Sequence, residues 1–282
     1  MISDSRTVSE RSPAGRLDRR QLAVLLVLFG LAAIAWALTD DRMAGMDEGP
    51  GTALGSLGFY VTAWVAMMAA MMFPSAAPMV LAYARIQGHR NKLGRRVPPA
   101  ATTVFVAGYM VAWAGFGVAT YALFALVDSL SIDALAWDRA GRYVAGGVIA
   151  AAAVYELTPA KDVCLSKCRG PLDFLMGGWR DGYRGALGMG VRHGAWCVGC
   201  CWALMAALFA LGVMSIGWMA FVAALIAGEK LLPRKAAATR GVALLLVVLG
   251  ITVAVVPERV PGLTLPHLGQ EDAMPAMQED AR

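Results

Sequence analysis

Charged side chains are scarce in this sequence. Only 16% of its 282 residues are charged, whereas 58% are hydrophobic, and the mean hydropathy is +0.58. Soluble globular proteins carry about 25% charged residues, so this chain has too few polar side chains to cover a water-soluble fold. Its net charge of +5 does not indicate a nucleic-acid partner. The basic residues lie in short segments beside apolar runs, where they orient membrane helices.

Histidines and catalytic motifs are scarce as well. There are three histidines, and two of them, His89 and His267, lie in predicted loops, which argues against a bis-histidine haem inside a helix bundle. The sequence has no G-x-x-x-x-G-K-S/T motif for phosphate binding and no Ser/His/Asp arrangement. Five cysteines cannot form a fully paired disulfide framework, because five is an odd number. We therefore name no catalytic residue and favour metal handling over catalysis.

The chain is rich in long apolar runs. Each is about as long as a helix that crosses ~30 Å of hydrocarbon at ~1.5 Å per residue. They predict an all-α polytopic transmembrane bundle of about seven spans in a lipid bilayer. The runs cover residues 21–38, 57–83, 100–127, 143–158, 195–214, 216–232 and 241–256. Pro74 and Pro78 lie inside the second run, which predicts a kinked or broken helix there.

The ends of the chain and its loops predict the domain organisation and orientation. Residues 1–20 are polar and basic, which indicates a disordered cytoplasmic arm before a transmembrane domain at 21–256; residues 257–282 form a disordered outer tail. Basic residues number one, five, two and six in the successive loops. By the positive-inside rule this alternation puts the N-terminus in the cytoplasm and the C-terminus outside. A cleavable signal peptide is the alternative for the first run, since Ala35-Trp36-Ala37 resembles a cleavage site, but we favour a retained anchor.

All the cysteines fall within one stretch of the sequence, in two groups. Cys164 and Cys168 form a C-x-x-x-C pair in the loop predicted after the fourth run. Cys197, Cys200 and Cys201 open the fifth run and share one helical face. The predicted orientation places both groups at the cytoplasmic side, where thiols stay reduced and can act as ligands. They predict a site for a soft ion, copper(I) first and zinc second. Thiol redox chemistry and simple packing of small apolar side chains are the alternatives.

Other candidate residues accompany the cysteines. His193 precedes Cys197 by four residues, one helical turn, and can supply a ring nitrogen as a supporting ligand, although a lone interfacial histidine often has no such role. Glu156 and Glu229 lie near the cytoplasmic ends of the fourth and sixth runs. Because an ionised side chain inside the bilayer costs roughly 2.5–3.5 kcal/mol, we expect both to have partners at the depth of the cysteines. Pairing with Lys230, or snorkelling to the interface, is the alternative for Glu229.

Methionines form a further group of soft atoms in the second run. They lie one turn apart in two pairs just before Pro74, and their thioethers can assist copper(I), although methionine also fills gaps in helix cores. The four residues are Met67, Met68, Met71 and Met72.

The sequence resembles a bacterial family of predicted metal-binding integral membrane proteins that carry a domain of unknown function. The motifs are Cys-Leu-Ser-Lys-Cys-Arg at residues 164–169 and Arg-His-Gly-Ala-Trp-Cys-Val-Gly-Cys-Cys-Trp at residues 192–202. The methionine-rich segment 64–78 and the Gly-Glu-Lys segment 228–230 are similar too, so the resemblance covers about residues 57–233. It implies a bacterial inner-membrane protein with a metal site at these cysteines. The family usually has a glutamine where this chain has Glu156.

These observations lead to one functional hypothesis and two alternatives. The hypothesis is a multi-pass protein of the bacterial inner membrane that binds copper(I) or zinc through its cysteine cluster and handles that metal, with a metallochaperone as the expected type of protein partner. The first alternative is a transmembrane thiol–disulfide carrier, which needs a cysteine pair reachable from both faces. The second is a small-solute transporter that uses the Pro74/Pro78 break and has incidental cysteines.

Overall fold

The computed structural model describes residues 19–43, 55–130, 140–212 and 215–260, and within these ranges every regular element is a helix. The predicted all-α fold is therefore confirmed. The helices are α1 (Arg19–Met43), α2 (Leu57–Lys92), α3 (Ala101–Ser129), α4 (Arg142–Glu156), α5 (Pro159–Arg169), α6 (Pro171–Met176), α7 (Gly182–Leu211), α8 (Ile216–Leu231), α9 (Lys235–Val255) and the short 3-10 helix η3 (Pro257–Arg259). Most of the predicted arm at 1–20 and of the predicted tail at 257–282 lies outside the described residues.

Five of these helices are long and apolar enough to cross a membrane, by length and composition: α1, α2, α3, α7 and α9. A sixth span arises if α4 and α5, which bend by 68° at the break between them, count as one. Helix α8 has 16 residues, about 24 Å at 1.5 Å per residue, which is shorter than the hydrocarbon core. Each of the seven predicted runs falls on a helix, but the number seven and the orientation stay predictions.

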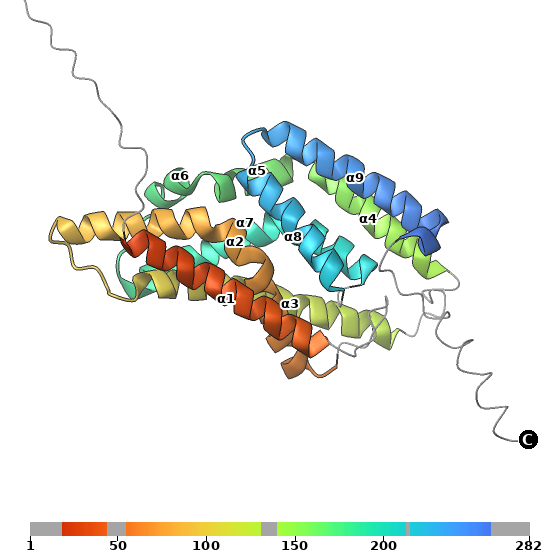
Figure 1. Cartoon of the computed structure of the whole chain (residues 1–282), viewed down its shortest axis with the longest axis horizontal. Coiled ribbons are helices and arrows are strands. Elements are labelled where there is room, and N and C mark those ends of the chain that lie inside the picture. Colours follow the sequence, from red (N-terminus) through yellow and green to blue (C-terminus); the bar gives the residue numbers. More distant parts are fainter. Residues whose placement is uncertain (1–18, 44–54, 131–139, 213–214, 261–282) are drawn as a thin grey trace, which may run out of the picture.

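Helix α2 is continuous through Pro74 and Pro78, so it is not broken. Figure 1 shows its two halves running in different directions, which agrees with the predicted kink. The structure differs from the sequence-based expectation in another place. The segment 159–193, predicted as a loop, folds as α5, α6 and the first turns of α7. Its charged residues masked this helicity, because the prediction followed apolar runs alone.

Helix α7 occupies the middle of the bundle and packs against α3, α4, α5 and α8. Glycines let its backbone approach that of α3: a Cβ at Gly190 would lie 2.0 Å from the Phe105 carbonyl oxygen, and one at Gly108 would lie 2.3 Å from that of Leu187. Such close contact of small residues is a common way to pack membrane helices. Figure 1 shows α1 beside α2 and α4 beside α9 on opposite sides of the molecule.

Large apolar side chains cover the outer surfaces of the bundle. Leu26 on α1 is 65% exposed and Leu244 on α9 is 66% exposed, and many neighbours on these helices are exposed as well. An apolar surface of this extent is stable against lipid chains and not against water. The exposed faces of α1 and α9 thus support the membrane environment that the composition predicts.

Candidate metal centre

Three cysteines line one face of α7. Cys197, Cys200 and Cys201 are spaced by three and four residues, and each is at most 2% exposed. The sequence predicted that these cysteines open a helix. Because α7 begins at Gly182, they lie near its middle instead. Their position buries them between α7 and the helices packed around it.

Helix α5 brings a fourth thiol to this face. Thr158 caps α5, with its side chain accepting a hydrogen bond from the Lys161 amide, and Pro159 occupies the first turn, where its missing N–H costs nothing. The bend before Thr158 turns α5 back across α7, and Cys168 Sγ lies 3.8 Å from Cys200 Sγ. The sulfur atoms of Cys168, Cys197 and Cys200 all lie within 4.8 Å of one another. We call these three residues the thiol trio.

The other two cysteines lie beside the trio. Cys201 Sγ is 3.3 Å from Cys200 Sγ, and Cys164 packs from α5 against Gly199, where a Cβ would lie 2.9 Å from its sulfur. All five cysteines are free thiols, and Cys164 and Cys168 are only half-buried. The structure therefore gathers every cysteine at the α5–α7 interface, with the trio at its centre.

The size of the thiol trio suits one soft ion. Metal–thiolate bonds are about 2.3 Å long, so three sulfurs in a plane around an ion lie about 4 Å apart. The observed separations, 3.8 Å for one pair and at most 4.8 Å for all, need only small side-chain adjustments to meet this value. The donor set is thus chemically and geometrically compatible with a thiophilic cation.

A half-buried lysine touches the trio, in a role that the sequence did not indicate. Lys230 Nζ donates hydrogen bonds to Cys197 Sγ at 3.0 Å and to Ser75 Oγ at 3.2 Å. The hydroxyl of Tyr109 lies 3.1 Å from the same cysteine sulfur. The Lys230 ammonium thus brings a positive charge into contact with a candidate metal ligand. The Lys230 side chain could be found only from the fold, because α8 and α7 meet here.

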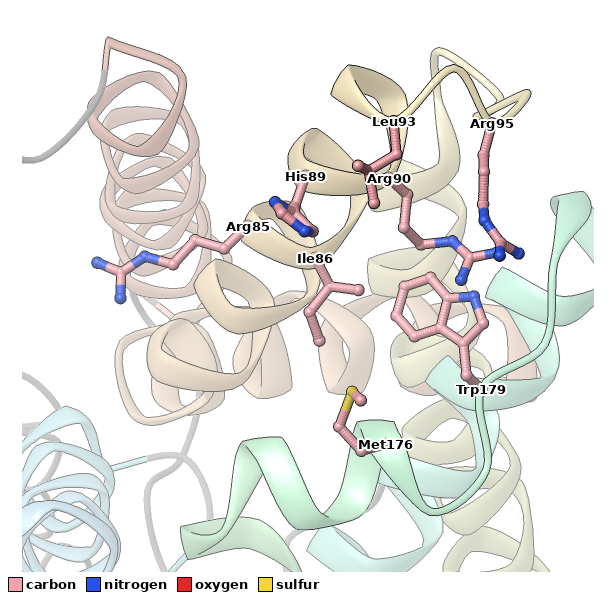
Figure 2. A pocket seen from close by; sticks show the side chains of 8 residues that line it. All are labelled: Arg85, Ile86, His89, Arg90, Leu93, Arg95, Met176 and Trp179. Carbon is pink, nitrogen blue, oxygen red and sulfur yellow. The ribbon is translucent and has the colours of Figure 1, made fainter.

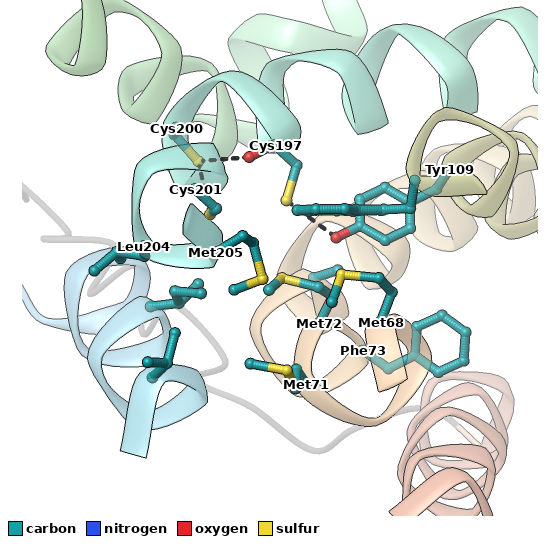
Figure 3. Close-up of a cluster of buried hydrophobic side chains, with 14 of the residues drawn as sticks. Met68, Met71, Met72, Phe73, Tyr109, Cys197, Cys200, Cys201, Leu204 and Met205 are labelled. Atoms are coloured by element: carbon teal, nitrogen blue, oxygen red, sulfur yellow. Dashed lines mark hydrogen bonds between the residues drawn. The ribbon is translucent and has the colours of Figure 1, made fainter. Parts of the chain in front are cut away.

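The methionines of α2 are buried, and two of them lie beside this cluster. Met67, Met68, Met71 and Met72 are 0–2% exposed, and Met205 of α7 is 1% exposed. Figure 3 shows Met68, Met72 and Met205 extending into the space between α2 and α7 below Cys197 and Tyr109. The predicted pairs therefore share a core with the thiols, and whether they assist a metal stays a prediction.

The two predicted carboxylates meet through a residue that the sequence analysis did not single out. Lys161 Nζ forms ion pairs with Glu156 Oε2 and, at 2.6 Å, with Glu229 Oε2. All three side chains are at most 2% exposed, and the second oxygen of each carboxylate has no hydrogen-bond partner. The alternative pairing of Glu229 with Lys230 is wrong, because Lys230 turns to Cys197 instead. The expectation that both carboxylates find partners holds, but the partner is an ammonium and not the thiols.

His193 lies one turn before Cys197 on α7 and is 3% exposed. Its ring stacks on Tyr109 and Phe105 and meets Phe174 edge-on, and its Nδ1 atom has no hydrogen-bond partner. It is not part of the group of ligand atoms within 4.8 Å. Its role as a supporting ligand stays a prediction.

A separate pocket of about 460 Å³ lies at the far end of α2. Figure 2 shows the guanidinium groups of Arg90 and Arg95 near Trp179, while Arg85 points towards α1. Arg90 Nη2 binds Asp181 at 2.6 Å, and the Trp179 indole and this guanidinium lower the pKa of the Asp181 carboxyl. The carboxylate of Asp181 thus acts as a local counter-ion for the arginines of the pocket. The pocket resembles a charged membrane interface more than a second metal site.

A sequence model described as the PpoB2 copper chaperone family matches residues 61–253, more than half of the chain. The chain belongs to this copper chaperone family. The matched copper chaperone segment contains all five cysteines, the buried Glu156–Lys161–Glu229 network and Lys230. Membership confirms the expected metal-binding family, whereas the ligand roles of single cysteines stay predictions. No curated protein and no solved structure matches the chain.

Proposed function

We propose that this protein is a membrane-embedded copper chaperone that holds one Cu(I) ion on the thiol trio of Cys168, Cys197 and Cys200. The observation that carries the proposal is the convergence of these sulfur atoms within 4.8 Å, from two helices that are separated along the chain. Membership of a copper chaperone family supports the same conclusion. Copper is cargo in this proposal, and the protein's task is to bind it and give it up again.

The surroundings favour Cu(I) over zinc. Thioethers select Cu(I), and the core beside the trio contains Met68, Met72 and Met205. Cys164, Cys201 and His193 remain proposed supporting donors.

The ammonium of Lys230 supports binding of a cation with low charge. Two thiolates and one Cu(I) ion carry a net charge of −1, which the single positive charge of Lys230 offsets. An uncompensated charge would be costly in this buried site. The third cysteine then binds as a neutral thiol, which keeps this charge balance.

The different burial of the trio suggests how copper is exchanged. Cys168 is half-buried, whereas Cys197 and Cys200 are at most 1% exposed. An incoming ion therefore meets Cys168 and the nearby Cys164 first and the buried α7 thiols last, and a departing ion leaves them in the reverse order. Stepwise exchange of thiolate ligands is a general route by which a soft ion passes between carriers, and a metallochaperone is the partner we propose.

Loop charges and the family resemblance support a bacterial inner-membrane location.

The test is the copper content of the detergent-purified protein after anaerobic loading with Cu(I). The wild type is expected to retain about one ion per chain, with sulfur scatterers at about 2.3 Å by X-ray absorption. Cys168→Ser, Cys197→Ser and Cys200→Ser are each expected to retain much less. Near-zero and equal copper in all four proteins would end the proposal.

The thiol–disulfide carrier remains the second candidate, because Cys168 Sγ and Cys200 Sγ lie only 3.8 Å apart. All five thiols lie at one interface, however, which is a poor arrangement for a carrier that must be reached from both membrane faces. Thiol trapping in cells distinguishes the two functions. A redox-dependent mobility shift that is absent from Cys168→Ser would favour the carrier.

A further inference from the structure

Two consecutive residues at the end of α8 reach the two halves of the thiol trio. Glu229 binds Lys161 of α5 at 2.6 Å, and α5 carries Cys168. Lys230 binds Cys197 of α7 at 3.0 Å. Neighbouring residues on an α-helix point about 100° apart, so one turn of α8 can hold two different helices at once.

A second contact ties α5 to the same turn. Arg169, which follows Cys168 directly, donates hydrogen bonds from its guanidinium to the backbone oxygens of Glu229 and Leu232. These carbonyls end α8 and have no partner inside that helix, so a cation is favourable there. Both ends of α5, Lys161 and Arg169, are thus docked on the end of α8, with Cys168 beside the second contact.

The ion network is a poor device for stability alone. Glu156 and Glu229 share one ammonium, and the Oε1 atom of each is buried without a partner. Incompletely satisfied buried networks stabilise a fold less than well-packed apolar side chains do. This network is better explained as a device that fixes the position of α5.

We propose that the Glu229–Lys230 turn of α8 is the positioning element that assembles the thiol trio, with Glu229 holding Cys168 in place through α5. The inference rests on the proposed function for its purpose, but the position of Cys168 can be measured without copper. Glu229 and Lys161 are positioning residues and do not contact the ion. Loss of the Glu229 contact releases the Lys161 end of α5 from α8 and leaves α5 held there by Arg169 alone, while Cys197 and Cys200 stay in place on α7.

Glu156 provides a matched control. It pairs with the same Lys161 ammonium through an equally buried carboxylate, but it belongs to α4 and makes no link to α8. Glu229→Gln and Glu156→Gln therefore make the same chemical change and remove the same charge. They differ only in which helix loses its hold on α5.

The experiment measures the alkylation rate of each cysteine in copper-free, detergent-purified protein, with a maleimide probe and peptide-resolved mass spectrometry. Glu229→Gln is expected to raise the rate at Cys168 about tenfold or more, with Cys197 and Cys200 still protected. Glu156→Gln is expected to change it by less than about threefold. Equal acceleration in both variants, or no change in Glu229→Gln, would overturn the inference.

Two additions keep the result decisive. If Glu229→Gln exposes all five cysteines, a second variant, Arg169→Gln, is measured, which removes the other α5–α8 contact and leaves the ion network intact. A selective increase in the alkylation rate of Cys168 in this variant supports the inference. The absence of that increase refutes it. For copper, a double-mutant cycle is expected to show that Glu229→Gln adds nothing to Cys168→Ser, but adds to Cys197→Ser. A wild type that binds no copper would refute the proposed function, while the alkylation result would still stand.

Discussion

Lys230 Nζ donates a hydrogen bond to Cys197 Sγ at 3.0 Å, between residues that lie 33 positions apart in the chain. This contact places a positive charge against a buried thiol in the centre of a membrane bundle. It links the end of α8 to the middle of α7.

Replacing Lys230 with leucine is expected to weaken Cu(I) binding by roughly 10- to 100-fold, because a hydrogen bond to a charged group contributes about 1.5–3 kcal/mol. Leucine keeps an apolar side chain at this position, removes the charge and adds no ligand atom for copper. Competition with a soluble Cu(I) chelator of known affinity measures the change. Arg234→Gln, an exposed basic residue just beyond α8, serves as the control and is expected to leave the affinity unchanged.

Cys200 and Cys201 are adjacent, but only Cys200 belongs to the thiol trio. Cys200→Ser is expected to lose most bound copper, and Cys201→Ser to keep more than about half, because only the former removes one of three converging ligands. Copper and protein are quantified in the same purified sample. If the Cys201 variant lost as much copper as the Cys200 variant, the ion would bind a different set of thiols.

Replacing Lys161 with methionine is expected to destabilise the protein by about 3–5 kcal/mol, because it leaves two buried carboxylates without a counter-ion. Thermal unfolding in detergent, followed by circular dichroism, measures the loss. The triple variant Lys161→Met, Glu156→Gln, Glu229→Gln is expected to recover much of it, since no unpaired charge remains. A triple variant no more stable than the single one would show that charge compensation is not the cause.

Gly190→Ala is expected to disrupt the contact between α3 and α7, because its Cβ would lie 2.0 Å from a backbone oxygen of α3. Overpacking of this kind typically costs about 1–3 kcal/mol, so the midpoint of unfolding falls. Gly188→Ala on the same helix is the control, since no atom lies within 4 Å of its Cβ. Alanine there is expected to keep or slightly raise stability, because it favours the helix.

The sequence by itself determined the environment of this protein. Its long apolar runs and few charges predict lipid as the solvent, and each of those runs falls on a helix. The spacing of Cys197, Cys200 and Cys201 also required a shared helical face, because that relation depends on the backbone of one helix alone. The composition around Cys164 and Cys168 pointed to a loop and missed α5, since a short, charged helix has no long apolar run.

Only the tertiary structure decided what these residues face. The 68° turn between α4 and α5 brings Cys168 to the α7 thiols, and the end of α8 sends Glu229 to Lys161 and Lys230 to Cys197. Two neighbours of opposite charge that look like a local pair in the sequence therefore serve different helices. Local spacing sets the direction of a side chain around its own helix, but its partner depends on helices that meet only after folding.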